Sequence, residues 1–206
     1  MNPNTQGLVD IGELILKFAK VNRVTLHEDA KRYESDTDHT VMLSVCACAV
    51  AEKLYKDSLD IGLVAQFAIV HDLVEAHAGD TDSFGIDSKD KLDKDKREHA
   101  SLLLIKEKFE SIYPWITVMI DKYESLDTKE ARFVKTLDKA MPKITHMLNA
   151  GEYFKKRGLT EDEMWRDYTT VVVTAEEKYG AEFKEVTEMM RELMEAIRKR
   201  TYRGRE

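Results

Sequence analysis

The sequence predicts an all-α protein, and three observations support that prediction. The 206-residue chain contains only 3 Pro and 9 Gly, so few residues interrupt a helix. Charged residues make up 34% and apolar residues 43%, a balance typical of globular helices. Apolar residues also recur at helical spacing along most of the chain. This length suits one globular domain, so we expect a single domain over 1–206, with its core near 10–150 and C-terminal helices near 160–200.

Each element can be predicted in turn. The first helix is expected from Leu8 to about Asn22, followed by a polar, irregular loop over 23–37. The second helix starts near Asp36 or Asp38, either of which could cap it. The later predicted elements are a helix over 60–77, an aspartate-rich loop over 79–95, and helices over 96–111, from Pro114, over 129–150, from the capping box 160–163 to Gly180, and over 181–200.

Composition and charge exclude several classes of partner. The net charge of −7 argues against a broad surface for nucleic acid polymers, although a small phosphorylated substrate is still compatible with it. No run of 18 apolar residues is present, so we expect no membrane span, and the N-terminus lacks the pattern of a signal peptide. Cys46 and Cys48 do not match a zinc-binding spacing. We therefore expect a cytoplasmic protein that does not bind membranes.

Carboxylates interrupt the apolar side of the third predicted helix. Ala68, Asp72 and Glu75 are spaced four and three residues apart, which places them on one helical face. Two unpaired carboxylates that face a core cost several kcal/mol each. A bound cation offsets that cost, whereas carboxylates at the rim of the bundle are simply solvated. Helical spacing leaves both explanations open.

Further histidine and aspartate side chains could complete a metal site. His39 shares a helical face with apolar residues, and Asp138 lies within another apolar stripe. Each of them alone also fits a core, capping or salt-bridged residue. Together, His39, His71, Asp72 and Asp138 offer two nitrogen and two oxygen ligands to one divalent transition metal. Mn, Co, Fe and Zn all tolerate such a ligand set, and the sequence does not choose among them.

Three segments resemble a known family. Residues 34–39 read Glu-Ser-Asp-Thr-Asp-His, residues 71–80 read His-Asp-Leu-Val-Glu-Ala-His-Ala-Gly-Asp, and residues 137–139 read Leu-Asp-Lys. In this order they resemble the motifs of the HD-domain metal-dependent phosphohydrolases, in particular the 5′-deoxynucleotidases, over roughly residues 10–150. The resemblance implies one all-α HD-domain helical bundle with a metal bound by His39, His71, Asp72 and Asp138.

The resemblance also implies roles for other residues. Glu75 is similar to the family residue that engages a water at the metal, and Asp80 resembles a second catalytic carboxylate. Arg23 falls where the family carries an arginine that contacts phosphate. Lys31 and Arg32 could help to hold phosphate or could simply be surface residues of the loop.

One departure from the family concerns the sugar. In the bacterial enzymes a tryptophan follows the phosphate-binding arginine and helps to reject a 2′-hydroxyl, but here the next residue is Val24. The segment after Asp80 also lacks a proline found in those enzymes. The resemblance therefore supports the hydrolytic chemistry better than it supports a preference for deoxyribose.

The expected reaction is hydrolysis of a (deoxy)nucleoside 5′-monophosphate to the nucleoside and phosphate. One alternative is a deoxynucleoside triphosphate triphosphohydrolase, which uses the same ligands but needs more basic groups around the pocket. Arg23, Lys31, Arg32 and the lysines within 89–97 leave this alternative open. Another alternative is a regulator that binds a metal and a nucleotide with little turnover, although Glu75 and Asp80 argue against it. We expect a small nucleotide as the substrate.

Two further expectations concern histidines and methionines. His77 and His99 offer ligands for a second metal, but the charged run 94–98 before His99 is more simply explained as a solvated face. Met189, Met190 and Met194 on the last helix could pack within the chain or face a second subunit. We expect a homodimer.

Overall fold

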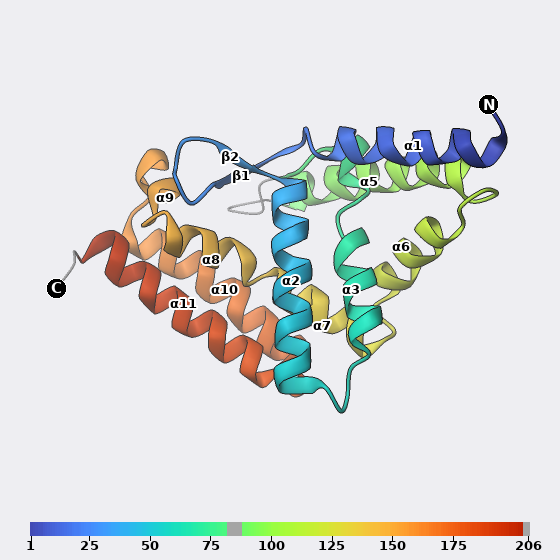
Figure 1. The fold of residues 1–206 in the computed structure, drawn as a ribbon. Helices are drawn as coiled ribbons and strands as arrows, with labels where there is room; N and C mark the ends of the chain where they lie inside the picture. The colour runs from blue at the N-terminus through green and yellow to red at the C-terminus, as the bar shows by residue number, and fades with distance from the viewer. Residues whose placement is uncertain (82–87, 204–206) are drawn as a thin grey trace. The chain divides into compact units, whose positions relative to one another are not determined.

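The computed structural model describes residues 1–81 and 88–203, and most of them are helical (Figure 1). This confirms the predicted all-α class. The helices gather into two compact units. The first unit comprises Met1–Arg23 and Ser35–Ala131, and the second comprises Val24–Glu34 and Arg132–Glu206. The predicted single domain over 1–206 stays a prediction.

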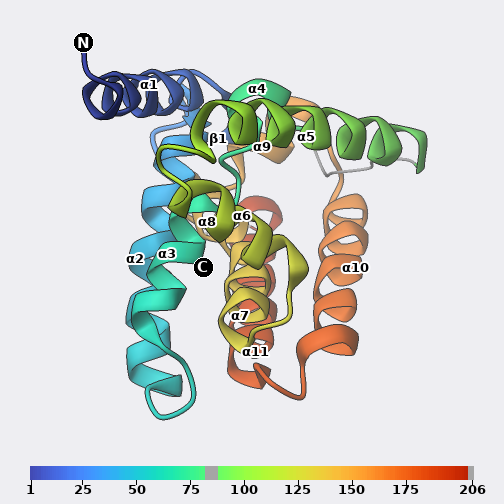
Figure 2. The same cartoon turned by 90° about the vertical axis from the view of Figure 1, so that its right-hand side faces the viewer.

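The first unit is built from six complete helices in its described part: α1 (Pro3–Phe18), α2 (Asp36–Tyr55), α3 (Ile61–Val70), α4 (Glu75–Ala78), α5 (Ser88–Phe109) and α6 (Trp115–Ser125). Helix α2 packs along α3, and the short α4 lies against both α1 and α5. Figure 2 shows α2 beside α3, and α4 next to the long α5. The pairs α2–α3 and α4–α5 matter most here because they carry the candidate site.

Small residues on α2 allow close packing in this unit. Ala47 and Ala51 are fully buried on the same side of α2 as Leu43, and Phe67 of α3 is equally buried. Burial of a side chain as large as Leu43 or Phe67 contributes about 2 kcal/mol to the stability of the folded state. The apolar contacts between α2 and α3 therefore hold the ends of both helices in fixed positions.

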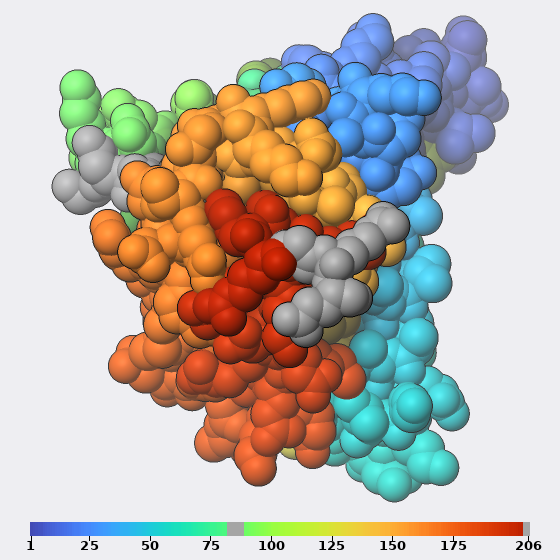
Figure 3. Space-filling model, turned by 90° about the vertical axis from the view of Figure 1, so that its left-hand side faces the viewer, coloured from blue at the N-terminus to red at the C-terminus, as the bar shows by residue number. Residues whose placement is uncertain are grey.

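The described part of the second unit holds most of the two paired strands, β1 (Asn22–Leu26) and β2 (Tyr33–Ser35). It also holds four complete helices: α8 (Met141–Leu148), α9 (Glu152–Arg157), α10 (Glu161–Tyr179) and α11 (Lys184–Tyr202). Helix α7 (Lys129–Asp138) begins in the first unit and ends in this one. Helix α11 packs on α8 and α10. In Figure 3 the red side chains of α11 are bordered by orange ones from the segment that includes α10.

Met190 and Met194 are buried inside the second unit, whereas Met189 is partly exposed. Met190 and Met194 therefore pack within the chain and do not face a second subunit. The hairpin is tied to the helices of its own unit: the Asn149 side chain donates to the Leu26 carbonyl (2.7 Å), and the Thr145 hydroxyl donates to Glu34 (3.3 Å).

Several predicted boundaries were wrong. Residues 23–37 were predicted as a loop, but they form the β1–β2 hairpin and the start of α2, because strands this short leave too little alternation to detect. Helix α1 starts at Pro3, which Asn2 caps, and ends at Phe18. Helix α5 starts at Ser88, well before residue 96. The rest of the aspartate-rich loop, 82–87, lies outside the described residues.

Two predicted helices are each divided in two. The helix expected over 60–77 is α3, a turn at 71–74, and α4, because hydrogen bonds such as Glu75 N–H to Asp72 O (2.8 Å) span three residues instead of four. The helix expected over 129–150 breaks after Asp138, and Pro142 lies in the first turn of α8. By contrast, α10 begins at the expected capping box and ends at Gly180.

One described stretch, Ile61–Ala78, has the length and the mean hydropathy (1.2) of a membrane span. Half of it is buried against other helices of the protein. The buried core helix of a soluble protein meets the same criterion, so this stretch is weak evidence for a membrane location.

Candidate metal centre

His39 is placed by the cap of helix α2. The Ser35 hydroxyl accepts a hydrogen bond from the Asp38 N–H (3.1 Å), and the Asp38 carboxylate accepts one from the Ser35 N–H (3.0 Å). This reciprocal capping box makes Ser35 the N-cap, where Asp36 or Asp38 was expected. His39 therefore lies in the first turn of α2, where its side chain is fully buried.

His71 and Asp72 lie in the turn that follows α3. The Nδ1 atom of His71 is 2.8 Å from the Ala68 carbonyl, which can only accept, so Nδ1 carries the proton. The lone pair of His71 is then on Nε2, which lies 2.9 Å from Asp72 Oδ2. In the neutral ring this lone pair and the carboxylate oxygen repel each other, and either a proton or a metal cation between them removes the repulsion.

These residues form a compact group of potential ligands. The Nε2 atom of His39 lies 3.8 Å from the same Asp72 oxygen, and one ligand atom from each of the three residues lies within 4.8 Å of the others. Nitrogen and oxygen bind transition metals at about 2.0–2.2 Å, so two ligands of one ion are about 3–4 Å apart. The donor set and its spacing therefore fit one divalent metal.

Arg23 reaches this group from β1. Its Nη1 atom lies 3.2 Å from Asp72 Oδ2 and 3.5 Å from Asp36 Oδ1. The guanidinium group is largely buried, with 13% of the side chain exposed. A buried arginine beside the ligands can bind an anion with two parallel hydrogen bonds.

A second group of carboxylates lies in the same unit. One oxygen each of Asp36, Glu75 and Asp80 lies within 4.8 Å of the others. Burial and the neighbouring negative charges raise the pKa of Glu75 to about 10 and that of Asp36 to about 7. Such a group holds protons or a cation, because three adjacent carboxylates cannot all stay ionised alone.

Gly79 explains the spacing between two of these carboxylates. Helix α4 ends there, with a positive φ of 76° that favours glycine. The Gly79 N–H donates to the Glu75 carbonyl (2.8 Å). The chain turns at this point, so that Asp80 comes back towards Glu75.

Comparisons with known proteins assign the chain to a family. The family model described as "HD domain" matches residues 15–179. The chain belongs to the HD-domain family. Curated relatives of this HD-domain chain include the 5′-deoxynucleotidase HDDC2 of Xenopus laevis, 28% identical over 76% of either chain, and that of Homo sapiens, 26% identical over 72% of this chain and 69% of the relative.

Solved structures show the same fold. A predicted metal-dependent phosphohydrolase from Magnetospirillum magnetotacticum superposes with a TM-score of 0.77, covering 97% of this chain and 95% of the other, at 24% identity. A conserved hypothetical protein from Pyrococcus furiosus has a TM-score of 0.60 at 23% identity, covering 89% and 99%. The family match and the curated relatives confirm the prediction of an HD-domain phosphohydrolase.

The remaining predicted residues of the HD-domain protein lie in the second unit. Asp138 ends α7, where its carboxylate pairs with the Lys139 ammonium group (2.9 Å). Lys31 and Arg32 are exposed next to the hairpin turn, and Arg32 donates to the Tyr33 carbonyl (3.2 Å). The roles predicted for these three residues stay predictions.

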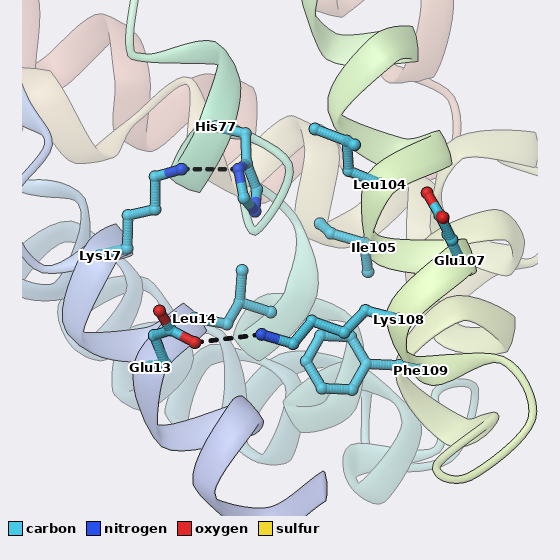
Figure 4. Close-up of a pocket in the computed structure, with 9 residues that line it drawn as sticks. All are labelled: Glu13, Leu14, Lys17, His77, Leu104, Ile105, Glu107, Lys108 and Phe109. Carbon is cyan, nitrogen blue, oxygen red and sulfur yellow. Dashed lines mark hydrogen bonds and ion pairs between the residues drawn. The ribbon is translucent and has the colours of Figure 1, made fainter.

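His77 borders a hollow of about 490 Å³ between α1, α4 and α5. Figure 4 shows the Lys17 ammonium group directed at the His77 ring, with Lys108 paired to Glu13 nearby. Burial and the two lysines lower the pKa of His77. Neither His77 nor the exposed His99 joins a group of three potential ligands in the described part of the HD-domain protein.

Sequence reasoning missed two residues near the site. Asp36 was considered only as a helix cap, but it is fully buried beside Arg23. Lys94 was considered as part of a solvated charged run or as one of several basic groups for a triphosphate, but its ammonium group lies 3.5 Å from Glu75. The spacing of Lys94, Glu98 and Ser101 by four and three residues was the available signal for a face of α5 that packs inward.

Proposed function

We propose that this HD-domain protein is a metal-dependent 5′-nucleotidase that hydrolyses (deoxy)nucleoside 5′-monophosphates to nucleoside and phosphate. The group of His39, His71 and Asp72, with Glu75 one turn further along the chain, carries the proposal. The curated relatives support the choice of substrate, because they are named 5′-deoxynucleotidases.

The ligands of the proposed metal are His39, His71 and Asp72, with Asp138 as the fourth, as the family pattern implies. Mn, Co, Fe and Zn all suit two nitrogen and two oxygen ligands. When bound, the ion supplies a Lewis acid that neutralises charge developing on the phosphoryl group. The Ala68 carbonyl keeps His71 in the tautomer that binds such an ion through Nε2.

The chain's own groups supply the remaining steps. Glu75 orients the attacking water and accepts its proton, Asp80 donates its own proton to the leaving 5′-oxygen, and transfer of a proton from Glu75 to the adjacent Asp80 restores both groups. Arg23 grips the phosphate, a task that suits a planar guanidinium group better than a lysine. Lys31 and Arg32 are proposed as additional phosphate contacts.

Phosphate release tests the proposal. The protein, loaded in turn with Mn²⁺, Co²⁺, Fe²⁺ or Zn²⁺, is assayed with ribo- and deoxyribonucleoside mono- and triphosphates. We expect inorganic phosphate from monophosphates, and loss of at least 100-fold in kcat with Asp72→Ala but not with the exposed control Asp95→Ala. Release of triphosphate would instead favour the triphosphohydrolase, and full activity of Asp72→Ala would contradict the metal mechanism.

We propose further that the protein is a cytoplasmic homodimer. Helix α2 is apolar on nearly every side, yet Val41 and Val45 are 58% and 65% exposed. Helices that are apolar all round are normally covered. A second copy of the chain on this face would cover both valines. Val45→Glu is therefore expected to yield monomers in analytical ultracentrifugation. The control Glu52→Gln, on the same helix, is expected to leave the dimer intact.

A further inference from the structure

Helix α5 brings a lysine to the buried Glu75. The Nζ atom of Lys94 lies 3.5 Å from Glu75 Oε1 and 3.3 Å from Glu98 Oε1. Only 2% of the Glu75 side chain is exposed, compared with 29% of Lys94. The ammonium group therefore reaches the carboxylate from the rim, with its stem along α5.

The packing of α5 on α4 holds this contact in place. Lys94, Glu98 and Ser101 recur at helical spacing on the face of α5 that meets α4. The Ser101 hydroxyl donates to the Val74 carbonyl, one residue before Glu75. Further along the same face, Ile105 is buried. The lysine is thus presented by a fixed helix and not by a loop.

The negative charges around Glu75 explain why a positively charged side chain is needed beside it. Glu75 lies with Asp36 and Asp80 in one group of carboxylates, which repel each other. A buried carboxylate without a counter-charge tends to take up a proton, and a protonated Glu75 could not accept one from water. Lys94 opposes this because its positive charge favours the ionised carboxylate.

We propose that Lys94 is a positioning residue of the hydrolase, which holds the Glu75 side chain in a fixed orientation for the attacking water and favours its ionised form. This rests on the function proposed above. Lys94 contacts Glu75 and acts through it, so its loss should lower kcat and leave substrate binding and metal content largely unchanged.

A neighbouring contact supports α5 as the positioning element. The Arg97 guanidinium group donates to the Thr81 hydroxyl (2.6 Å), which follows Asp80 directly. Helix α5 therefore contacts the chain at Glu75 and again beside Asp80. Both proposed catalytic carboxylates lie in the segment between these contacts.

Three variants on α5 test the role of Lys94. Lys94→Met removes the charge but keeps the length, and Lys94→Arg keeps a cation. Lys96→Met is the control, because Lys96 is 65% exposed and pairs with Asp93 of its own helix. We expect Lys94→Met to lower kcat about 10- to 100-fold at unchanged KM and metal stoichiometry. Lys94→Arg should recover most of the rate, and Lys96→Met all of it.

Each other outcome overturns the proposal. A rise in KM alone makes Lys94 a substrate contact, and an unchanged kcat removes it from the reaction. If the wild-type protein releases no phosphate, the proposed function fails, and carbon NMR of the Glu75 carboxyl then decides the role of Lys94. Lys94→Met must raise the pH at which that carboxyl titrates while Lys96→Met does not; equal titration in both variants refutes the pairing.

Discussion

His71 and His146 show how surroundings give one residue type two roles. Both rings are buried and both use Nδ1 in a hydrogen bond, His71 with the Ala68 carbonyl and His146 with the Tyr168 hydroxyl. The other nitrogen of His71 faces a carboxylate, whereas the His146 ring stacks on Tyr153 with ring centres 4.8 Å apart. A cation suits the first environment, and a neutral ring suits the second.

The aromatic surroundings of His146 predict how the protein responds to acid. Burial, with help from Lys143, lowers the pKa of His146 from 6.5 to about 3. The unfolded chain binds a proton more readily, so the stability contributed by this ring is present above pH 6.5 and is lost as the pH falls towards 3. The loss at pH 5 is expected to be about 2 kcal/mol in urea unfolding.

Variants separate this effect from general acid denaturation. His146→Phe should flatten the dependence of stability on pH between 6.5 and 5, even if its stability at pH 7 is lower. The exposed His99→Gln serves as the control and should keep the wild-type slope. An unchanged slope in His146→Phe would assign the acid response to other groups.

Helix α2 depends on its cap, and the cap also places a ligand. Ser35→Ala removes the hydroxyl that accepts from the Asp38 N–H and keeps the backbone N–H that donates to the Asp38 carboxylate, at a cost of about 1 kcal/mol. Because His39 lies in the first turn, the same change should weaken metal binding several-fold in a competition titration. Ser58→Ala, three residues beyond the other end of α2, should change neither quantity. Wild-type metal affinity in Ser35→Ala would show that the cap does not position His39.

Elements defined by local signals were predictable, and those defined by packing were not. The helices after Ser35 and Thr160 start within a residue or two of the expected positions because a capping box is written in four consecutive residues. The turn at 71–74 was predicted as helix, since apolar spacing is nearly the same for hydrogen bonds across three or four residues. Lys94 appeared solvated because Glu75, the buried one of its two partners, lies on another helix.

The candidate site was predictable to a similar degree. His39, His71 and Asp72 come together as the family resemblance implied. Helical spacing alone had left Asp72 and Glu75 open to a solvated rim position, and it gave no reason to place Asp36 beside them. Asp36 comes close to Asp72 and Glu75 because α2 contacts the end of α3, and no local sequence pattern encodes that contact.

At the scale of the whole chain, the two units are connected three times, after Arg23, after Glu34 and after Ala131. So many connections favour cooperative unfolding, as in a single domain. The chain has two tryptophans, Trp115 in the first unit and Trp165 in the second. We expect Trp115→Phe and Trp165→Phe, each with one remaining fluorophore, to report the same urea midpoint; two midpoints would define two domains.

Metal addition should stabilise the whole protein. At a free metal concentration about 100 times Kd, binding to the folded state adds about 2.7 kcal/mol to the free energy of unfolding. Asp138→Ala should lose most of that gain, whereas Asp57→Ala, at an exposed position just after α2, should keep it. A full gain with Asp138→Ala would exclude Asp138 as a ligand.

The hairpin has a consequence for how this protein can be divided. Residues 24–34 belong with helices encoded more than a hundred positions later, as the contacts of Leu26 with Asn149 and of Glu34 with Thr145 show. No single cut in the coding sequence therefore yields the second unit intact. A C-terminal fragment that starts at Arg132 would leave the Asn149 and Thr145 side chains without these acceptors, so truncation is a poor route to a minimal version of this protein, and point substitutions are the appropriate tool.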